Sequence, residues 1–302
     1  MTTSTSRDAE IADLLVGAID IHCHSGPAAM PRILDHHEAM LDAAAAGFRA
    51  VLFKDHYYLG VAHSIILEKL VPDTGVRLFS GVALNNASGG INPYAVDHAI
   101  KIGGKIVWMP TLSAANHIAK SATETKNFPS SGKKMLPALP LSVLDANGRL
   151  TDDTKAVLDL IAEGDIILAG GHLDANEQLL MFAEAKARGV TKMLVNHPTY
   201  VIGCSDEDIR SLVSMGVYME HSLCMFVEGR AHKWEPAELA RLIRLAGVDR
   251  TVLSSDLGLT GSPRPVEGFR TTVGNLLELG FSADEIRSLV GDNAATLLNL
   301  DA

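Results

Sequence analysis

The stretch DIHCHS, residues 20–25, comes directly after the apolar run 13–19, at the point where a buried strand would end. Side chains alternate between the two faces of a strand, so His22 and His24 point the same way, with Asp20 in register with them. This is a chelating geometry. With 12 His in 302 residues, however, a chance His-x-His is expected about once in every two such chains. The pair alone also fits two core or solvated histidines.

Short β-branched or apolar runs alternate with amphipathic stretches along the whole chain. The predicted strands are residues 18–22, 49–54, 76–84, 104–110, 165–172, 192–197, 217–221 and 250–256. The predicted helices are residues 36–47, 62–71, 94–103, 152–164, 176–189, 205–216, 235–247 and 267–280. This alternation predicts a closed parallel (β/α)8 TIM barrel, one domain over residues 1–302. An open doubly wound sheet is the alternative, but no Gly-x-Gly-x-x-Gly follows the first strand.

Polar side chains follow the predicted strands at their carboxyl ends, where a parallel barrel gathers its reactive groups. Besides His22 and His24, these residues are Lys54, His56, His172, His197, Glu220, His221 and Asp256. Each is weak evidence by itself, but their shared position predicts one site at the mouth of the barrel. Six other histidines fall on helices or loops and are given no role: His36, His37, His63, His98, His117 and His232.

This order of ligand types resembles the metal-dependent amidohydrolase superfamily, and the ending GDNAATLLNL, residues 291–300, is similar to a common ending there. The resemblance implies that His22, His24 and Asp256 hold a metal ion. It also implies that His172 joins them in single-metal members. His197 would then position substrate or water, or itself act as a ligand.

The fourth predicted strand departs from the superfamily pattern, because residues 108–111 offer Trp, Met, Pro and Thr where binuclear members carry a bridging lysine or glutamate. One metal is therefore favoured over two. Zn²⁺ is the first expectation and Mn²⁺ or Fe²⁺ are alternatives, since imidazole suits all three. Lys54 has two possible roles, a carbamylated bridge between two metals or an ammonium that receives substrate. It could also be only a surface partner of Asp55.

The predicted chemistry is hydrolysis of an amide, cyclic amide, ester or lactone carbonyl by a metal-activated water, with Asp256 as general base and His197 polarising the carbonyl. Lys54, His56, Glu220 and His221 are expected to contact substrate. Glu220 could instead be a buried hydrogen-bond acceptor. A second hypothesis is a metal-dependent decarboxylase of an aromatic or unsaturated acid. A non-catalytic metal-binding or ligand-binding barrel is the third.

The formal charge of −10 argues against nucleic acid and favours a small-molecule partner. The sequence shows neither a signal peptide nor an apolar run long enough to span a membrane, so a cytoplasmic protein is expected. The resemblance implies a homo-oligomer. Residues 113–150 are long for a loop and predict a lid or insert, with a small hairpin around Asn147 and Gly148. Lysines in this insert would favour an anionic substrate, namely Lys120, Lys126, Lys133 and Lys134.

Overall fold

The computed structural model describes residues 2–123 and 131–300. Two compact units make up the chain, and each is described by itself. Unit 1 consists of Met1–Phe53, His63–Phe79 and His221–Ala302, and unit 2 consists of Lys54–Ala62 and Ser80–Glu220. The single domain expected from the sequence stays a prediction. Within the described residues, no helix combines the length and the apolar character needed to cross a membrane.

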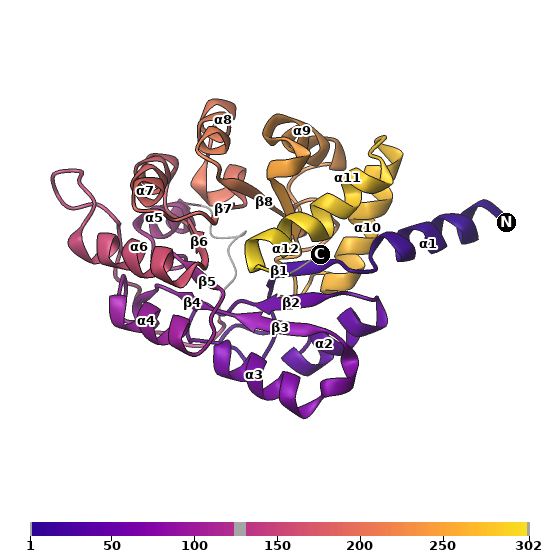
Figure 1. The fold of residues 1–302 in the computed structure, drawn as a ribbon, viewed down its shortest axis with the longest axis horizontal. Helices are drawn as coiled ribbons and strands as arrows, with labels where there is room; N and C mark the ends of the chain where they lie inside the picture. The colour runs from indigo at the N-terminus through magenta and orange to yellow at the C-terminus, as the bar shows by residue number, and fades with distance from the viewer. Residues whose placement is uncertain (1, 124–130, 301–302) are drawn as a thin grey trace. The chain divides into compact units, whose positions relative to one another are not determined.

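Unit 1 contains a parallel pairing of two buried strands, β1 (Ile19–Cys23) and β2 (Ala50–Phe53), with Asp20 opposite Val51. The sheet order continues to β3 (Arg77–Ser80), and β9 (Thr251–Ser254) contacts β1. The longer helices of this unit are α1 (Thr2–Leu14), α2 (His36–Ala45), α3 (Val61–Leu70), α9 (Pro236–Ala246) and α10 (Pro265–Glu278). Its short elements are η1 (Pro72–Thr74), η4 (Leu223–Met225), η5 (Val248–Arg250), α11 (Ala283–Arg287), η6 (Ser288–Asp292) and α12 (Asn293–Leu298). In Figure 1, α1 packs against α10.

Unit 2 is built from consecutive parallel strands, each paired with the next along the chain. The strands are β4 (Val82–Ala83), β5 (Ile106–Trp108), β6 (Ile167–Ala169), β7 (Met193–Asn196) and β8 (Tyr218–Ser222), which runs from unit 2 into unit 1. The helices are α4 (Pro93–Lys101), α5 (Ala115–Thr123), α6 (Asp152–Gly164), α7 (Ala175–Ala187) and α8 (Asp206–Ser214). Two short helical segments, η2 (Asn86–Ser88) and η3 (Pro198–Ile202), follow β4 and β7. Helices α4, α6, α7 and α8 follow one another as neighbours around the strands (Figure 1).

The strand predicted over residues 76–84 is present as two short strands, β3 and β4, separated by Gly81. A Cβ atom at Gly81 would lie 1.9 Å from the backbone oxygen of Ile106 in β5. Only a residue without a side chain allows the two backbones to approach so closely. The remaining predicted strands and helices match observed elements, although several are shorter than predicted. Four of the α-helices described were not predicted: α1, α5, α11 and α12.

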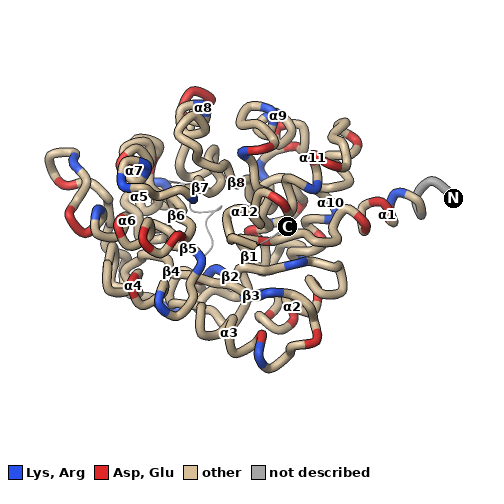
Figure 2. Tube along the Cα trace, in the orientation of Figure 1, with Lys and Arg blue, Asp and Glu red and all other residues tan. Residues whose placement is uncertain are grey.

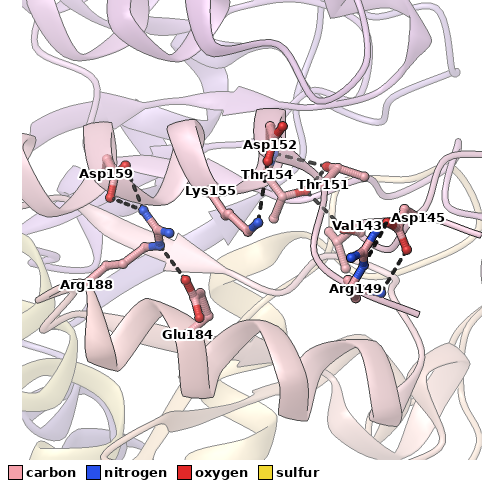
Figure 3. A network of polar contacts seen from close by, with 10 residues as sticks. All are labelled: Val143, Asp145, Arg149, Thr151, Asp152, Thr154, Lys155, Asp159, Glu184 and Arg188. Carbon is pink, nitrogen blue, oxygen red and sulfur yellow. Dashed lines mark hydrogen bonds and ion pairs between the residues drawn. The ribbon is translucent and has the colours of Figure 1, made fainter. Parts of the chain in front are cut away.

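The predicted hairpin is confirmed by the antiparallel bridge between Leu144 and Leu150, and the carbonyl of Val143 beside it accepts a hydrogen bond from Thr154 of α6 (Figure 3). Asp145 N donates to the carbonyl of Arg149 across the turn, and the guanidinium of Arg149 reaches the carboxylate of Asp145. Arg188, just after α7, bonds both Asp159 of α6 and Glu184 of α7. These exposed ion pairs fix the local geometry and contribute little to stability. Residues 124–130 of the predicted insert, Lys126 among them, lie outside the described residues.

Charge is concentrated on the helices and connecting loops, whereas the strands are mostly uncharged (Figure 2). All residues of β1, β2, β5, β6 and β7 are buried. Several helices begin with acidic or hydroxyl N-caps, such as Asp35 before α2 and Asp174 before α7, each in a reciprocal capping box. The acidic net charge is therefore a surface property, while the strand ends carry the buried polar groups that matter for function.

Candidate metal centre and histidine cluster

Three predicted metal ligands converge in unit 1. His22 lies in β1, His24 follows directly after it, and Asp256 follows β9. Each offers one ligand atom, and these atoms all lie within 4.8 Å of one another. Oδ1 of Asp256 is 3.1 Å from Nε2 of His22 and 3.0 Å from Nε2 of His24. We call these three residues the metal triad.

Backbone hydrogen bonds between the ends of β1 and β9 hold the metal triad in place. Asp256 N donates to the carbonyl of His22, and His24 N donates to the carbonyl of Leu257, at 2.8 and 2.9 Å. Asp256 has a left-handed φ of 48°, a conformation that Asp tolerates better than most residues. At Gly258, a Cβ would lie 1.6 Å from the carbonyl oxygen of His24, so this close approach requires glycine.

Asp20 supports the metal triad through backbone hydrogen bonds and is not one of its three members. Its Oδ1 accepts hydrogen bonds from the backbone N–H groups of His22 and Ser255, both at 3.0 Å. One buried carboxylate oxygen thereby ties β1 to the residue before Asp256. Burial raises the pKa of Asp20, and these hydrogen bonds oppose that shift. Asp20 therefore helps to position the two histidines of the metal triad.

The donor set of the metal triad fits a divalent transition ion. Burial, reinforced by the nearby charge of Arg32, lowers the pKa of His24 to about 3 against the pull of Asp256, so the imidazole is neutral. Burial also acts to raise the pKa of Asp256, but His22 and His24 outweigh it and hold that pKa well below its usual range. Neutral imidazole and ionised carboxylate are the forms that bind metal. Two nitrogens and one oxygen suit Zn²⁺, Mn²⁺ or Fe²⁺.

Four histidines gather in unit 2, and we call them the imidazole cluster: His56, His117, His172 and His197. The ring of His172 is central, with its centroid 4.8 Å from that of His117, 5.0 Å from that of His197 and 6.3 Å from that of His56. All four residues are buried. Burial lowers the pKa of His172 well below its usual range, and the nearby basic groups lower it further. The ligand role predicted for His172 stays a prediction.

His197 is held in one tautomer by its neighbours. It follows β7 with a left-handed φ of 30°, and its Nδ1 lies 3.2 Å from the carbonyl oxygen of Tyr200. Because a carbonyl oxygen only accepts, Nδ1 of His197 carries the proton in this contact. In the neutral ring, Nε2 then presents a lone pair, which suits a ligand or a proton acceptor.

Helix α5 organises the imidazole cluster, and its role was missed in the sequence. Nδ1 of His117 lies 2.7 Å from Nδ1 of His172, so the two rings share a hydrogen bond. Asn116 Nδ2 donates to the carbonyls of His172 and Val201, at 3.0 and 2.9 Å. Val201 has a left-handed φ of 63°, a costly conformation for a β-branched residue, and Lys120 also donates to its carbonyl.

Lys54 is buried, with 2% of its surface exposed, so the interpretation of it as a surface partner of Asp55 is wrong. Its Nζ lies 5.5 Å from the ring centroid of Trp108 at the end of β5. This is the geometry of a cation–π contact, which an ammonium favours and a carbamate anion does not. Trp108 thus stands at the strand end where the superfamily resemblance would place a bridging ligand, and the ammonium of Lys54 lies beside its ring.

The two predicted substrate contacts on β8 are successive residues of the strand. Glu220 lies opposite Asn196 of β7 and accepts a hydrogen bond from its Nδ2. Glu220 is fully buried, which agrees with the interpretation of it as a structural acceptor. The His221 ring lies 6.5 Å from that of Phe226 within unit 1. Substrate contact by either residue stays a prediction.

Solved structures share this fold at low sequence identity. An amidohydrolase from Pseudomonas aeruginosa matches with a TM-score of 0.64 and 11% identity, over 97% of this chain and 98% of that one. The probable dipeptidase PvdM from Pseudomonas aeruginosa matches with a TM-score of 0.66 and 12% identity, over 97% and 98% of the two chains. A mutant PTE-like lactonase from Deinococcus radiodurans matches with a TM-score of 0.57 and 14% identity, over 94% and 96%. The predicted amidohydrolase-type (β/α)8 fold is thereby confirmed.

At the level of sequence, no curated protein matches the chain. One family model does match, over residues 17–220, and its description is a family of unknown function, DUF6282. The matched region includes both histidines of the metal triad and all four members of the imidazole cluster. It covers more than half of the chain. The chain therefore belongs to the DUF6282 family.

Proposed function

We propose that the chain is a metal-dependent hydrolase that adds water to the carbonyl of an amide, cyclic amide, ester or lactone in a small molecule. The observation that carries the proposal is the metal triad, in which two buried imidazoles and a carboxylate converge within 4.8 Å. The amidohydrolase, dipeptidase and lactonase names of the structural neighbours support hydrolysis. We propose one bound ion, Zn²⁺ first and Mn²⁺ or Fe²⁺ as alternatives.

His22, His24 and Asp256 would hold this ion, and His172 is the further ligand that the superfamily resemblance implies. When bound, the ion supplies Lewis acidity, which polarises a carbonyl and makes water more acidic. Asp256 supplies the proton acceptor. Its Oδ1 contacts both imidazoles, while no described residue hydrogen-bonds its Oδ2. The side chain is 15% exposed, so a water molecule can reach it.

Asp256 both accepts and returns the proton in this reaction. Asp256 takes it from the attacking water as the carbon–oxygen bond forms, and returns it to the leaving nitrogen or oxygen as the scissile bond breaks. The tautomer of His197 determines which role this residue can have in the reaction. With Nδ1–H donating to Tyr200, a neutral His197 offers a lone pair at Nε2, which suits a ligand or proton acceptor better than a donor to the carbonyl oxygen.

The test is metal analysis of the native protein, followed by a screen of lactones, esters, amides and cyclic amides. We expect one divalent ion per chain and turnover that falls about 10²-fold or more in Asp256→Asn, measured per bound ion. Asp249→Asn is the matched control, because that carboxylate is 84% exposed in the same unit. Protein that stays metal-free after incubation with all three ions, or near-normal turnover per ion in Asp256→Asn, would contradict the proposal.

A decarboxylase is the second candidate, and Trp108 is the observation that favours it. The indole at the end of β5 leaves no bridging ligand there, which suits the single-metal branches of the superfamily, including decarboxylases. Aromatic and unsaturated carboxylates belong in the same screen for this reason. Release of carbon dioxide, without incorporation of oxygen from labelled water, would identify a lyase and exclude hydrolysis.

A small-molecule substrate is part of the proposal. The cytoplasmic location and the homo-oligomeric state that the sequence suggested stay predictions, as does the absence of a nucleic-acid or membrane partner. Sedimentation of the purified protein measures the oligomeric state directly.

A further inference from the structure

His117 and His172 share one hydrogen atom across a buried contact. Their Nδ1 atoms lie 2.7 Å apart, and both residues are buried. Burial disfavours a charged imidazole, so each ring is neutral and carries one proton. Two ring nitrogens at this distance form a hydrogen bond only if one is protonated and the other accepts. The two rings therefore have opposite tautomers: one presents a lone pair at Nε2, and the other presents an N–H there.

The geometry of the contact fixes the direction of the His172 ring as well as its tautomer. The planes of the two rings are inclined by 20°, and their centroids are 4.8 Å apart. Because the Nδ1 atoms are closer than the faces of stacked rings can come, the rings meet at their nitrogen edges. The lone pair and the N–H bond of an imidazole lie in the ring plane, so this arrangement suits a hydrogen bond. A change at His117 should therefore alter both the orientation and the proton position of His172.

Helix α5 is anchored to the backbone of His172 by further hydrogen bonds. Asn116, the residue before His117, donates from Nδ2 to the carbonyl of His172 at 3.0 Å. The same Nδ2 donates to the carbonyl of Val201 at 2.9 Å. The backbone N–H of His172 donates to the carbonyl of Pro110, also at 2.9 Å. These bonds hold the backbones of His117 and His172 at a fixed separation, so the contact between the two rings is built into the fold.

We propose that His117 is a positioning residue, which accepts a hydrogen bond from Nδ1 of His172 and thereby leaves the Nε2 lone pair of His172 for a metal ion. The inference rests on the proposed function, in which His172 is a ligand of the bound ion. An imidazole that binds a metal through one nitrogen carries its proton on the other and donates it to a neighbouring acceptor. His117 supplies this acceptor. The reverse arrangement would place an N–H at Nε2 of His172, where it would block ligation.

The tautomer assigned to His172 matches that of its neighbour His197. Nδ1 of His197 donates to the carbonyl of Tyr200, so the lone pair of this ring is at Nε2. The ring centroids of His172 and His197 are 5.0 Å apart. Two neighbouring imidazoles that both present a lone pair suit a divalent transition ion. His117 thus has the same effect on His172 that the carbonyl of Tyr200 has on His197.

The test is the ¹⁵N NMR spectrum of the imidazoles in the metal-free native protein, with His172→Gln used to identify the signals of His172. We expect a protonated Nδ1 and a bare Nε2 for His172, and a protonated Nε2 for His117. A scalar coupling between the two Nδ1 atoms should be measurable across the hydrogen bond. Addition of Zn²⁺ should shift the Nε2 signal of His172 and leave its Nδ1 protonated. A protonated Nε2 of His172, or no coupling between the Nδ1 atoms, would overturn the assignment.

Three variants separate positioning from a merely structural role. His117→Leu removes the acceptor, so His172 should lose its Nδ1–H tautomer and the protein should bind Zn²⁺ about tenfold or more weakly, measured by competition with a chromophoric chelator. His117→Asn places Oδ1 close to the position of Nδ1 and should restore both properties. His98→Leu is the matched control, because His98 is exposed on α4 of the same unit. Wild-type Zn²⁺ affinity in His117→Leu, or equal losses in the Leu and Asn variants, would refute the role. If His117→Leu does not fold, the wild-type spectrum and His117→Asn decide.

This inference and the proposed function can fail separately, because the tautomer is measured without metal or substrate. If His172 shows the expected tautomer and loses it in His117→Leu, but the protein binds no metal ion, the positioning contact stands and the proposed hydrolase fails. If the metal-loaded protein hydrolyses a substrate while His117→Leu keeps the wild-type tautomer and Zn²⁺ affinity, the hydrolase stands and the role of His117 is refuted.

Discussion

His36 should make the folded protein sensitive to mild acid. The side chain is buried at the start of α2, hydrogen-bonded through Nδ1 to Oγ of Ser25 and stacked on Phe53 with ring centroids 4.5 Å apart. Burial, together with the neighbouring His63 and despite the pull of Asp35, lowers its pKa from 6.5 to about 4. The folded protein therefore resists a proton that the unfolded chain accepts.

The sign and size of the effect follow from this difference in pKa. Between pH 6.5 and pH 4 the unfolded chain binds more protons at His36, so the free energy of unfolding falls as the pH falls. The contribution of His36 is fully retained above pH 6.5 and is lost by pH 4. The difference between a pKa of 6.5 in the unfolded chain and about 4 in the folded protein amounts to about 3 kcal/mol in total. About 2 kcal/mol of this is lost by pH 5.

The variant His36→Asn isolates this contribution, because its amide can still hydrogen-bond Ser25 but does not titrate. Urea unfolding at pH 7.5 and pH 5 should show that the variant loses about 2 kcal/mol less stability than wild type over this interval. His37→Asn is the matched control, since His37 is the exposed neighbour. Equal acid sensitivity of wild type and His36→Asn would refute the reasoning.

Two further substitutions test the backbone contacts around the strand ends. Gly81→Ala should cost more than about 3 kcal/mol in calorimetric unfolding, because its Cβ would lie 1.9 Å from a backbone oxygen of Ile106. Gly274→Ala, which meets only a flexible side chain, should change stability by less than about 1 kcal/mol. Asn116→Ala should cost about 2 kcal/mol for its two hydrogen bonds, and exposed Asn147→Ala almost nothing. If the two variants of either pair lose the same stability, the contact described for Gly81 or for Asn116 does not stabilise the fold as stated.

The metal triad could be predicted from sequence because its geometry depends on regular features. Alternation in a strand places His22 and His24 on one side, and the carboxyl ends of parallel strands bring Asp256 to the same edge. The structure confirms this convergence with Oδ1–Nε2 distances of 3.0 and 3.1 Å. His24 and Asp256 lie 232 positions apart in the sequence, and the fold class alone brings them together.

Helix α5 and the contacts of His117 could not be predicted in the same way. The helix has only 9 residues, few of them apolar, and it lies in a segment that the sequence predicts as a long loop. Its hydrogen bond to His172 joins residues 55 positions apart through two side chains. Such a contact depends on the path of the connecting loop, which strand and helix patterns leave open. Likewise, the division of the strand over residues 76–84 depends on the approach of β5 at Gly81, a tertiary constraint that hydrophobicity does not record.

Trp108 bears on the number of metal ions that the site can hold. The superfamily resemblance places an anionic bridge at this strand end in two-metal members, and an anion there offsets part of the charge of a second cation. In this chain an indole stands at that position with the ammonium of Lys54 over its ring. A second divalent ion beside this ammonium would be repelled rather than stabilised. Trp108 at this strand end therefore supports the proposal of one metal ion rather than two.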